Sequence, residues 1–387
     1  MNTTIDTASA AELLGRLVAC PSVNPAGAVP SGPTFGEEAM ADLVASILAD
    51  CGAEVRKVQI SPGRFNLIAR FPGMTLRSLM LEAHSDTVSI EGMTVPPFDA
   101  VVRGGRLFGR GSCDDKGPMA AMLLAIRSVL GGGFRPAGTV YFVSTADEEI
   151  GATGAKAILA GGPRPEMAVI GEPTDMAVIH AHKGASRVRI TTRGRAAHSS
   201  DPSAGVSAIA RMARIVGAIE GPYARRLAGR PHPVAGPPTV SVGRISGGTQ
   251  VNVVPDRCEI DVDRRTVPGE TRDGVLAEFR AILDEMRASD PLLEYDMAES
   301  QWWPAFEEDP GGPVAGLVAA ACNKVLGRAE MRTAPWTSNA GVFSAGGVPC
   351  VLFGPGSARQ AHTADEYIEL DQVVAAAWVY AEIIRAF

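Results

Sequence analysis

The chain has 387 residues, 46% of them hydrophobic and 20% charged, a balance that suits a globular protein with a large core. Its net charge of -7, without any run rich in lysine and arginine, excludes a typical nucleic-acid-binding surface. We find no stretch of 18 uncharged apolar residues and no basic-then-apolar N-terminus, so we expect neither a membrane span nor a signal peptide. The 6 cysteines are scattered without a CxxC pair, which favours reduced thiols and a cytoplasmic protein.

Helical and strand patterns alternate in the first half of the chain. Helices are expected over 36–52 and 117–133, where apolar residues recur at helical spacing and glycine ends the pattern. Short apolar or alternating segments predict strands at 54–60, 65–71, 76–84, 139–145 and 166–173. This alternation is typical of an α/β fold in which helices flank a largely parallel sheet.

The pattern changes after His182. The expected elements are then a strand at 185–196, a helix at 203–219, strands near 239–248 and 258–265, a helix at 270–288 and a strand at 292–298. This β-α-β-β-α-β order predicts a separate ferredoxin-like α+β domain.

The α/β pattern resumes near the C-terminus, with an apolar segment at 348–356 and a helix at 371–386. We therefore expect one larger domain made of residues 1–183 and 297–387. A smaller domain, residues 184–296, is inserted into it.

Acidic residues and histidines follow several of the apolar strands. Three places in the chain carry them. His84, Asp86, Asp147, Glu148, Glu149 and Glu172 stand at the carboxyl ends of expected strands. Asp114 and Asp115 stand in the loop before the helix at 117–133, and His362 follows the last glycine loop. Because the carboxyl ends of strands form the ligand crevice of an open α/β sheet, we expect these side chains to converge.

Several carboxylates gathered in one crevice would repel one another unless cations were bound. The available ligands are oxygen and nitrogen, which suit zinc and also cobalt or manganese. They are more numerous than one open zinc site requires, and they fit two metals about 3.5–4 Å apart that share a bridging carboxylate. Each motif alone has an ordinary structural explanation, so the prediction depends on their combination.

These motifs resemble those of a known family. AHSDTV, GRGSCDDKG, TADEEIG, IGEPT and the GPGS…AHTADEYIE tail are similar, in this order, to the two-zinc aminoacyl hydrolases of the acetylornithine deacetylase and succinyl-diaminopimelate desuccinylase family. Aminoacylases and glutamate carboxypeptidases also belong to it. The resemblance extends over nearly the whole chain, and IGEPT, AHKG and HSSDP are most similar to acetylornithine deacetylase.

The resemblance implies a ligand for each metal position. His84 and Glu172 would bind one zinc, Glu149 and His362 would bind the other, and Asp114 would bridge the two. The larger domain would therefore be the catalytic, metal-binding domain.

The resemblance also implies the catalytic roles. Asp86 would orient His84, and Glu148 would be the general base for a hydroxide that bridges the zinc ions. The bond between Asp114 and Asp115 would be a cis peptide. His198, in the inserted domain, would reach across a homodimer interface and donate to the oxyanion, which makes that domain a lid and dimerisation domain.

Substrate contacts are implied for Asn252, for Arg265, which would pair with the α-carboxylate, and for the glycine loop of Gly354 and Gly356. Asn339 departs from the pattern, because the family usually has an acid there, near the substrate side chain. The loss of a negative charge would weaken selection for a cationic side chain such as that of ornithine.

The expected function is the metal-dependent hydrolysis of the amide bond of an N-acyl amino acid. The reaction favoured by the resemblance is the deacetylation of N-acetylornithine in arginine biosynthesis. A dipeptidase, carboxypeptidase or desuccinylase of the same family is the alternative. A non-catalytic metal-binding scaffold is an alternative of another class, which the presence of Glu148 beside a full ligand set disfavours.

Overall fold

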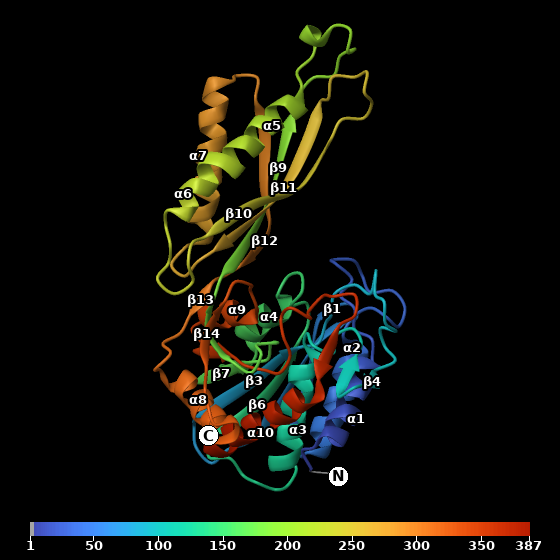
Figure 1. The fold of residues 1–387 in the computed structure, drawn as a ribbon, viewed down its shortest axis with the longest axis vertical. Coiled ribbons are helices and arrows are strands. Elements are labelled where there is room, and N and C mark those ends of the chain that lie inside the picture. The colour runs from blue at the N-terminus through green and yellow to red at the C-terminus, as the bar shows by residue number, and fades with distance from the viewer. Residues whose placement is uncertain (1–3) are drawn as a thin grey trace. The chain divides into compact units, whose positions relative to one another are not determined.

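The computed structural model describes residues 4–387, which divide into two units along the chain. The first unit extends to His180 and also contains Glu307–Thr333 and Ser338–Phe387. The second unit comprises Ala181–Phe306 and Ala334–Thr337, so it is an insertion into the first. In Figure 1 the colours of this insertion run from green to orange, and the blue and red ends of the chain belong to the first unit.

The first unit is built on a sheet whose strands run in the order β1-β2-β6-β3-β7-β15-β8-β13, with β14 paired to β8. The central neighbours β6, β3, β7 and β15 are parallel, whereas β1, β2 and β8 are antiparallel additions. The strands are β1 (Glu54–Ser61), β2 (Arg64–Phe71), β3 (Ser78–His84), β6 (Thr139–Thr145), β7 (Met167–Ile170), β8 (Val178–His182), β13 (Phe306–Glu307), β14 (Met331–Ala334) and β15 (Cys350–Leu352).

A small sheet, β16-β5-β4, lies beside the loop that precedes α3 (Lys116–Val129). Its strands are β4 (Val101–Arg103), β5 (Arg106–Phe108) and β16 (Tyr367–Glu369). Because β16 pairs with β5, the C-terminal segment that follows His362 is tied to the segment just before Asp114.

Helices cover the main sheet of the first unit (Figure 1). They are α1 (Thr7–Val18), α2 (Glu38–Asp50), α3 (Lys116–Val129), α4 (Thr153–Gly161), α8 (Pro313–Leu326), α9 (Asn339–Ala345) and α10 (Leu370–Ala386). The most deeply buried is α3, which packs against α1, α10 and β3. Its sequence is apolar on all sides, and such a helix is stable only in a core.

The second unit contains the antiparallel sheet β10-β11-β9-β12, with helices packed on one face. Its elements are β9 (Gly184–Arg193), a 3-10 turn (Pro202–Ala204), α5 (Ala208–Ala218), a π-helical turn (Ile219–Tyr223), α6 (Ala224–Ala228), β10 (Thr239–Gly247), β11 (Arg257–Thr266), α7 (Arg272–Ser289) and β12 (Glu294–Trp303). The predicted fold class is confirmed, with a largely parallel central sheet and an inserted ferredoxin-like domain.

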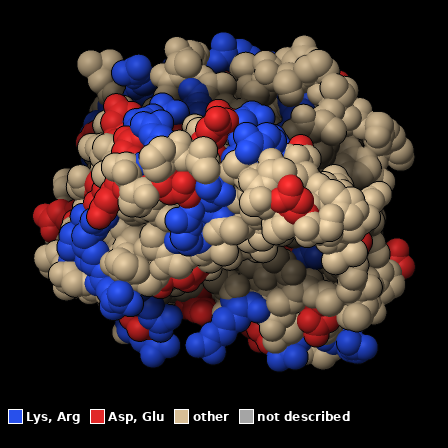
Figure 2. Space-filling model, turned by 90° about the horizontal axis from the view of Figure 1, so that it is seen from above, with Lys and Arg blue, Asp and Glu red and all other residues tan. Residues whose placement is uncertain are grey.

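The other face of this sheet carries paired charges. Arg189 and Arg193 contact Asp261 and Asp296 at 2.8 and 2.7 Å across neighbouring strands. Figure 2 shows basic and acidic side chains intermixed on the face of the molecule that it presents. None of the helices within residues 4–387 has the length and hydropathy that crossing a membrane requires.

The core of the second unit yields a stability prediction. The Phe279 ring is fully buried and meets the Tyr223 ring edge-on at 5.4 Å. We expect Phe279→Ala to lower the free energy of unfolding by about 3–5 kcal/mol, because it removes buried surface and leaves a cavity. Urea unfolding followed by circular dichroism would measure the change. Arg280→Ala, at the neighbouring exposed position, should change it by less than about 0.5 kcal/mol, and equal effects would contradict the packing described.

Candidate metal centre

The first half of the centre is formed where β3 ends. Nε2 of His84 lies 2.9 Å from Oδ1 of Asp114, and Nδ1 of His84 lies 3.0 Å from the carbonyl oxygen of Asp86. The backbone N–H of His84 donates to Oδ2 of Asp115 at 3.1 Å. The buried His84 ring is therefore fixed by contacts at both nitrogens, and Nε2 faces the Asp114 carboxylate.

The second half uses the other oxygen of the same carboxylate. Nε2 of His362 lies 3.4 Å from Oδ2 of Asp114 and 3.1 Å from Oε2 of Glu149. Glu149 follows β6, and His362 follows the glycine loop after β15. The structure thus joins three segments that are far apart in the sequence.

Two potential metal-binding groups result, His84/Asp114/Asp115 and Asp114/Glu149/His362, and the ligand atoms in each lie within 4.8 Å of one another. Asp114 is common to both, as a bridging ligand requires. Oδ1 of Asp115 is buried and has no hydrogen-bond partner within residues 4–387. The oxygen and nitrogen donors and this unpaired oxygen fit a pair of divalent cations.

The expected ligand Glu172 is in neither group, but it lies close by. It follows β7 and is buried. Burial, and then the negative charges of Asp114 and Glu148, raise the pKa of Glu172 well above its usual value. Its carboxylate therefore belongs to the same electrostatic cluster, whereas Asp115 completes the three-residue group around His84. The Asp114–Asp115 peptide bond is cis.

The electrostatics of the centre reflect a deficit of positive charge. Hydrogen bonds to Asp114 and Glu149 raise the pKa of His362 to about 10. Burial raises the pKa of Glu148 well above its usual value, and the charge of Glu149 adds to the effect. Protons are thus held where cations would relieve the same repulsion.

Asp86 holds the turn that carries Glu148 and Glu149. Its Oδ1 accepts a hydrogen bond from the backbone N–H of Glu148 at 3.0 Å, and its Oδ2 accepts one from that of Glu149 at 3.1 Å. Oδ1 of Asp86 also lies 3.6 Å from Nδ1 of His84. Asp86 therefore contacts one residue of each group, the His84 ring and the backbone of Glu149.

Glu366 is a residue that the sequence analysis missed. Its carboxylate accepts hydrogen bonds from the backbone N–H groups of Gly111, Cys113 and Asp114 at 2.9–3.1 Å, and from the Arg110 guanidinium at 2.7 Å. The loop before Asp114 is thereby bonded to the segment after His362. One indication of such a residue is present in the sequence: the backbone N–H groups of the glycine-containing loop before Asp114 require hydrogen-bond acceptors.

Asn339 occupies an interior position. It is 1% exposed, and its amide donates to Oε1 of Glu82 and to Oγ1 of Thr145, both at 3.0 Å. Burial raises the pKa of Glu82 to about 7. These contacts connect α9 to β3 and β6 just before the ligand-bearing ends of the two strands.

The two predicted loop glycines lie where backbones approach closely. A Cβ on Gly354 would come within 2.5 Å of the Glu172 carbonyl oxygen, and one on Gly356 within 2.7 Å of the Cys113 sulfur. The N–H of Gly354 donates to the hydroxyl of Thr174. Both glycines therefore allow the loop before His362 to pack against the other ligand-bearing segments.

The remaining predicted residues belong to the second unit. His198 is exposed, and its Nδ1 contacts the Ser200 hydroxyl at 2.7 Å. The carbonyl of Asn252 accepts a hydrogen bond from Ser199, so the loops that carry His198 and Asn252 are neighbours. Arg265 is partly exposed and pairs with Asp263 at 2.7 Å, whereas Arg264 is fully buried and contacts Tyr223.

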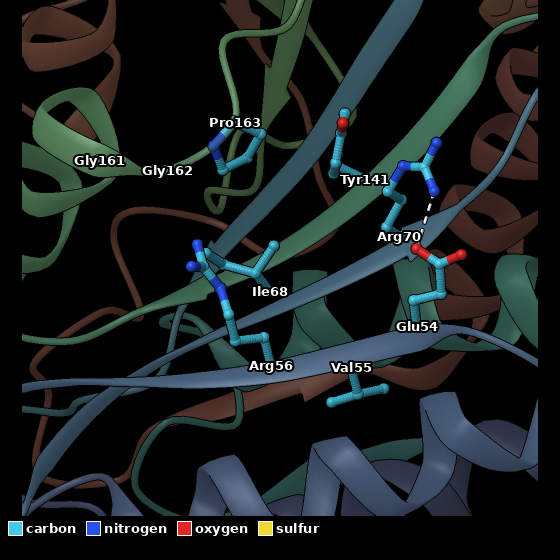
Figure 3. Close-up of a pocket in the computed structure, with 9 residues that line it drawn as sticks. All are labelled: Glu54, Val55, Arg56, Ile68, Arg70, Tyr141, Gly161, Gly162 and Pro163. Atoms are coloured by element: carbon cyan, nitrogen blue, oxygen red, sulfur yellow. Dashed lines mark hydrogen bonds and ion pairs between the residues drawn. The ribbon is translucent and has the colours of Figure 1, made fainter.

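A separate groove of about 380 Å³ lies on the face of β1, β2 and β6, beside the end of α4 (Figure 3). It is lined by Arg56, Ile68, Tyr141 and the Arg70–Glu54 pair, whose guanidinium and carboxylate are 2.8 Å apart. None of the predicted site residues lines it. This groove is therefore separate from the metal centre.

Similar proteins were found in sequence comparisons. The acetylornithine deacetylase of Proteus mirabilis is 33% identical over 369 residues, which cover 93% of this chain and 92% of that protein. The acetylornithine deacetylase of Photorhabdus laumondii is 31% identical and covers 97% of this chain and 96% of its own.

Solved structures share the fold. Aminopeptidase PepT from Bacillus cereus has a TM-score of 0.78 at 23% identity and covers 98% of each chain. The M20 family metallo-carboxypeptidase Sso-CP2 from Sulfolobus solfataricus has a TM-score of 0.81 at 18% identity, covering 97% of this chain and 98% of that one. Residues 80–386 match the peptidase family M20/M25/M40. The chain belongs to this family of metal-dependent hydrolases.

Proposed function

We propose that the protein is an amidohydrolase that removes the acyl group from an N-acyl amino acid, with N-acetylornithine as the first candidate substrate. The observation that carries the proposal is the pair of ligand groups sharing Asp114, with Glu148 adjacent to one of the ligands. The relatives named acetylornithine deacetylase, which are similar over nearly the whole chain, support this choice of substrate.

The ligand set accommodates two divalent cations, for which zinc is proposed, with cobalt or manganese as substitutes. His84 and Asp115, with Glu172 in the same electrostatic cluster, would hold one ion, Glu149 and His362 would hold the other, and Asp114 would serve both. When bound, the ions supply a Lewis acid that polarises the scissile carbonyl and makes water more acidic.

Glu148 is the general base of the proposed reaction. It takes a proton from the attacking water and passes it to the leaving amine, which balances the hydrolysis of the amide. Burial raises the pKa of the Glu148 carboxyl well above its usual value, which makes the carboxylate a stronger base toward the water proton that it later passes to the amine. Its backbone N–H is held by Asp86, which fixes the start of the side chain.

Substrate contacts are proposed for the second unit. Arg265 pairs with the substrate α-carboxylate, a role for which its planar fork of donors is suited. Asn252 contacts the amide, and His198 donates to the developing oxyanion of a partner subunit in a homodimer. The exposure of His198 and Asn252 supports these roles, because their side chains are accessible.

The substrate is tested by measuring amine release from a panel by the zinc-loaded protein. The panel holds N-acetylornithine, other N-acetyl and N-formyl amino acids, N-succinyl-diaminopimelate and several dipeptides. We expect N-acetylornithine to have the highest kcat/KM. Preference for neutral N-acyl amino acids would keep the proposed reaction and change the proposed substrate. Preference for dipeptides would favour the peptidase alternative.

Replacing the base should separate chemistry from metal binding. We expect Glu148→Gln to lower kcat by about 10²–10⁴-fold, because proton transfer is lost, while the metal content stays at the wild-type level. Steady-state kinetics and elemental analysis of the same sample would measure both. Glu166→Gln, which alters an exposed carboxylate paired with Arg77, is the matched control and should keep full activity. Wild-type kcat in the Glu148 variant would contradict the assignment.

The shared ligand gives a prediction about stoichiometry. Asp114→Asn should reduce the bound metal from about two ions per chain to one or fewer, since both groups lose a charged donor. Elemental analysis after dialysis against metal-free buffer measures the change, again with Glu166→Gln as the control. Two tightly bound ions in the Asp114 variant would show that it is not a bridge.

A further inference from the structure

The turn that carries Glu148 and Glu149 has an unusual backbone at its first residue. Asp147 has a φ of +64°, a left-handed conformation that asparagine and aspartate tolerate better than most residues. Its buried carboxylate accepts hydrogen bonds from Arg64 at 2.8 Å, Asn24 at 3.1 Å and Thr153 at 2.7 Å. Asp147 is therefore held from three separate segments of the chain.

Arg64 is the cation of this network. It is the first residue of β2, only 6% exposed, and its guanidinium binds both oxygens of Glu37, with Nε at 3.1 and 2.9 Å. Glu37 is fully buried just before α2 and also accepts the backbone N–H of Asp147 at 3.3 Å. The Arg64–Glu37 pair therefore holds both the side chain and the backbone of Asp147.

Asn24 extends the network to the metal centre. Its amide nitrogen donates to Oδ2 of Asp86 at 2.7 Å as well as to Asp147. Asp86 in turn accepts the backbone N–H groups of Glu148 and Glu149. A continuous line of hydrogen bonds thus runs from Arg64 through Asp147, Asn24 and Asp86 to the backbones of the proposed base and a proposed ligand.

A purely structural ion pair would be expected to end on groups unrelated to the reaction. This network instead holds the turn at its first residue through Asp147 and at its next two residues through Asp86. Arg64 is the only arginine or lysine among its members, so its loss leaves the buried carboxylates of Glu37 and Asp147 without their cation.

We propose that Arg64 is a positioning residue for the hydrolytic reaction, which sets the turn carrying Glu148 and Glu149 through its contacts with Glu37 and Asp147. The inference rests on the proposed function, because it assigns Arg64 a role through Glu148. Arg64 contacts no ligand group itself; it acts through Asp147, Asn24 and Asp86.

The test compares Arg64→Met and Arg64→Lys with the wild-type enzyme. We expect Arg64→Met to lower kcat by about 10- to 100-fold at unchanged KM, the range seen when residues behind metal ligands are removed. The visible absorption spectrum of the Co²⁺-loaded protein should change, because Glu149 moves. Arg64→Lys keeps the positive charge but lacks the planar guanidinium, so its kcat should lie between those of the wild type and Arg64→Met.

Arg211→Met is the matched control, because it removes a partly buried arginine from an ion pair with Asp290 in the second unit. It should leave kcat and the cobalt spectrum unchanged. A folded Arg64→Met protein with wild-type kcat and spectrum would overturn the proposal. So would losses equal to those of Arg211→Met.

If Arg64→Met does not fold, Asn24→Ala decides, since it leaves the Arg64–Glu37 pair intact and cuts the link between Asp147 and Asp86. A lower kcat with a changed cobalt spectrum supports the proposal, and unchanged values overturn it. If the wild-type protein hydrolyses nothing in the panel, the proposed function fails. The cobalt spectrum and Co²⁺ affinity of the variants then decide the positioning role separately.

Discussion

Repulsion among buried carboxylates is the constraint on which this structure depends. Asp114, Glu148, Glu149 and Glu172 lie out of water at one edge of a sheet, where each negative charge disfavours the others. The histidines His84 and His362 offset part of the repulsion, and divalent cations would offset the rest. A core strand ending in three consecutive acids is stable only in such surroundings.

The fold brings these charges together and also supplies partners that hold their loops. Parallel β3, β6 and β7 end at the same edge, which places residues from distant parts of the chain side by side. Behind the ligand-bearing loops lie two buried arginine–glutamate pairs, Arg64–Glu37 and Arg110–Glu366. In each pair the glutamate also accepts backbone N–H groups from a ligand-bearing loop or turn, so one interaction provides both charge compensation and geometry.

The two units carry different parts of the proposed activity. The first holds the ligand groups and Glu148, which are the parts that amide hydrolysis requires. The second holds Arg265, Asn252 and His198, which are proposed to contact the α-carboxylate, the amide and the developing oxyanion. Asn339, bonded to Glu82 beneath the ligand-bearing strands, belongs to the support of the first unit.

The sequence by itself indicated most of the longer helices and strands and the types of residue that gather at the strand ends. Apolar periodicity located the buried α3 and the strands, because burial on all sides or on one face leaves a direct pattern in neighbouring residues. Motifs at strand ends indicated that acidic residues and histidines would gather at one edge of the sheet, since parallel strands place their carboxyl ends together.

Only the tertiary structure decided which residues stand behind those ligands. Asn24, Glu37 and Arg64 meet Asp147 across separations of 83 to 123 residues, and Glu366 meets the Asp114 loop across about 250. No local pattern records such pairs, because a single buried hydrogen bond depends on the path of two distant segments. The same reason applies to Asn339, which is bonded to Glu82, and to Asp115, which lies beside His84. Both positions depend on contacts between segments that are distant in the sequence.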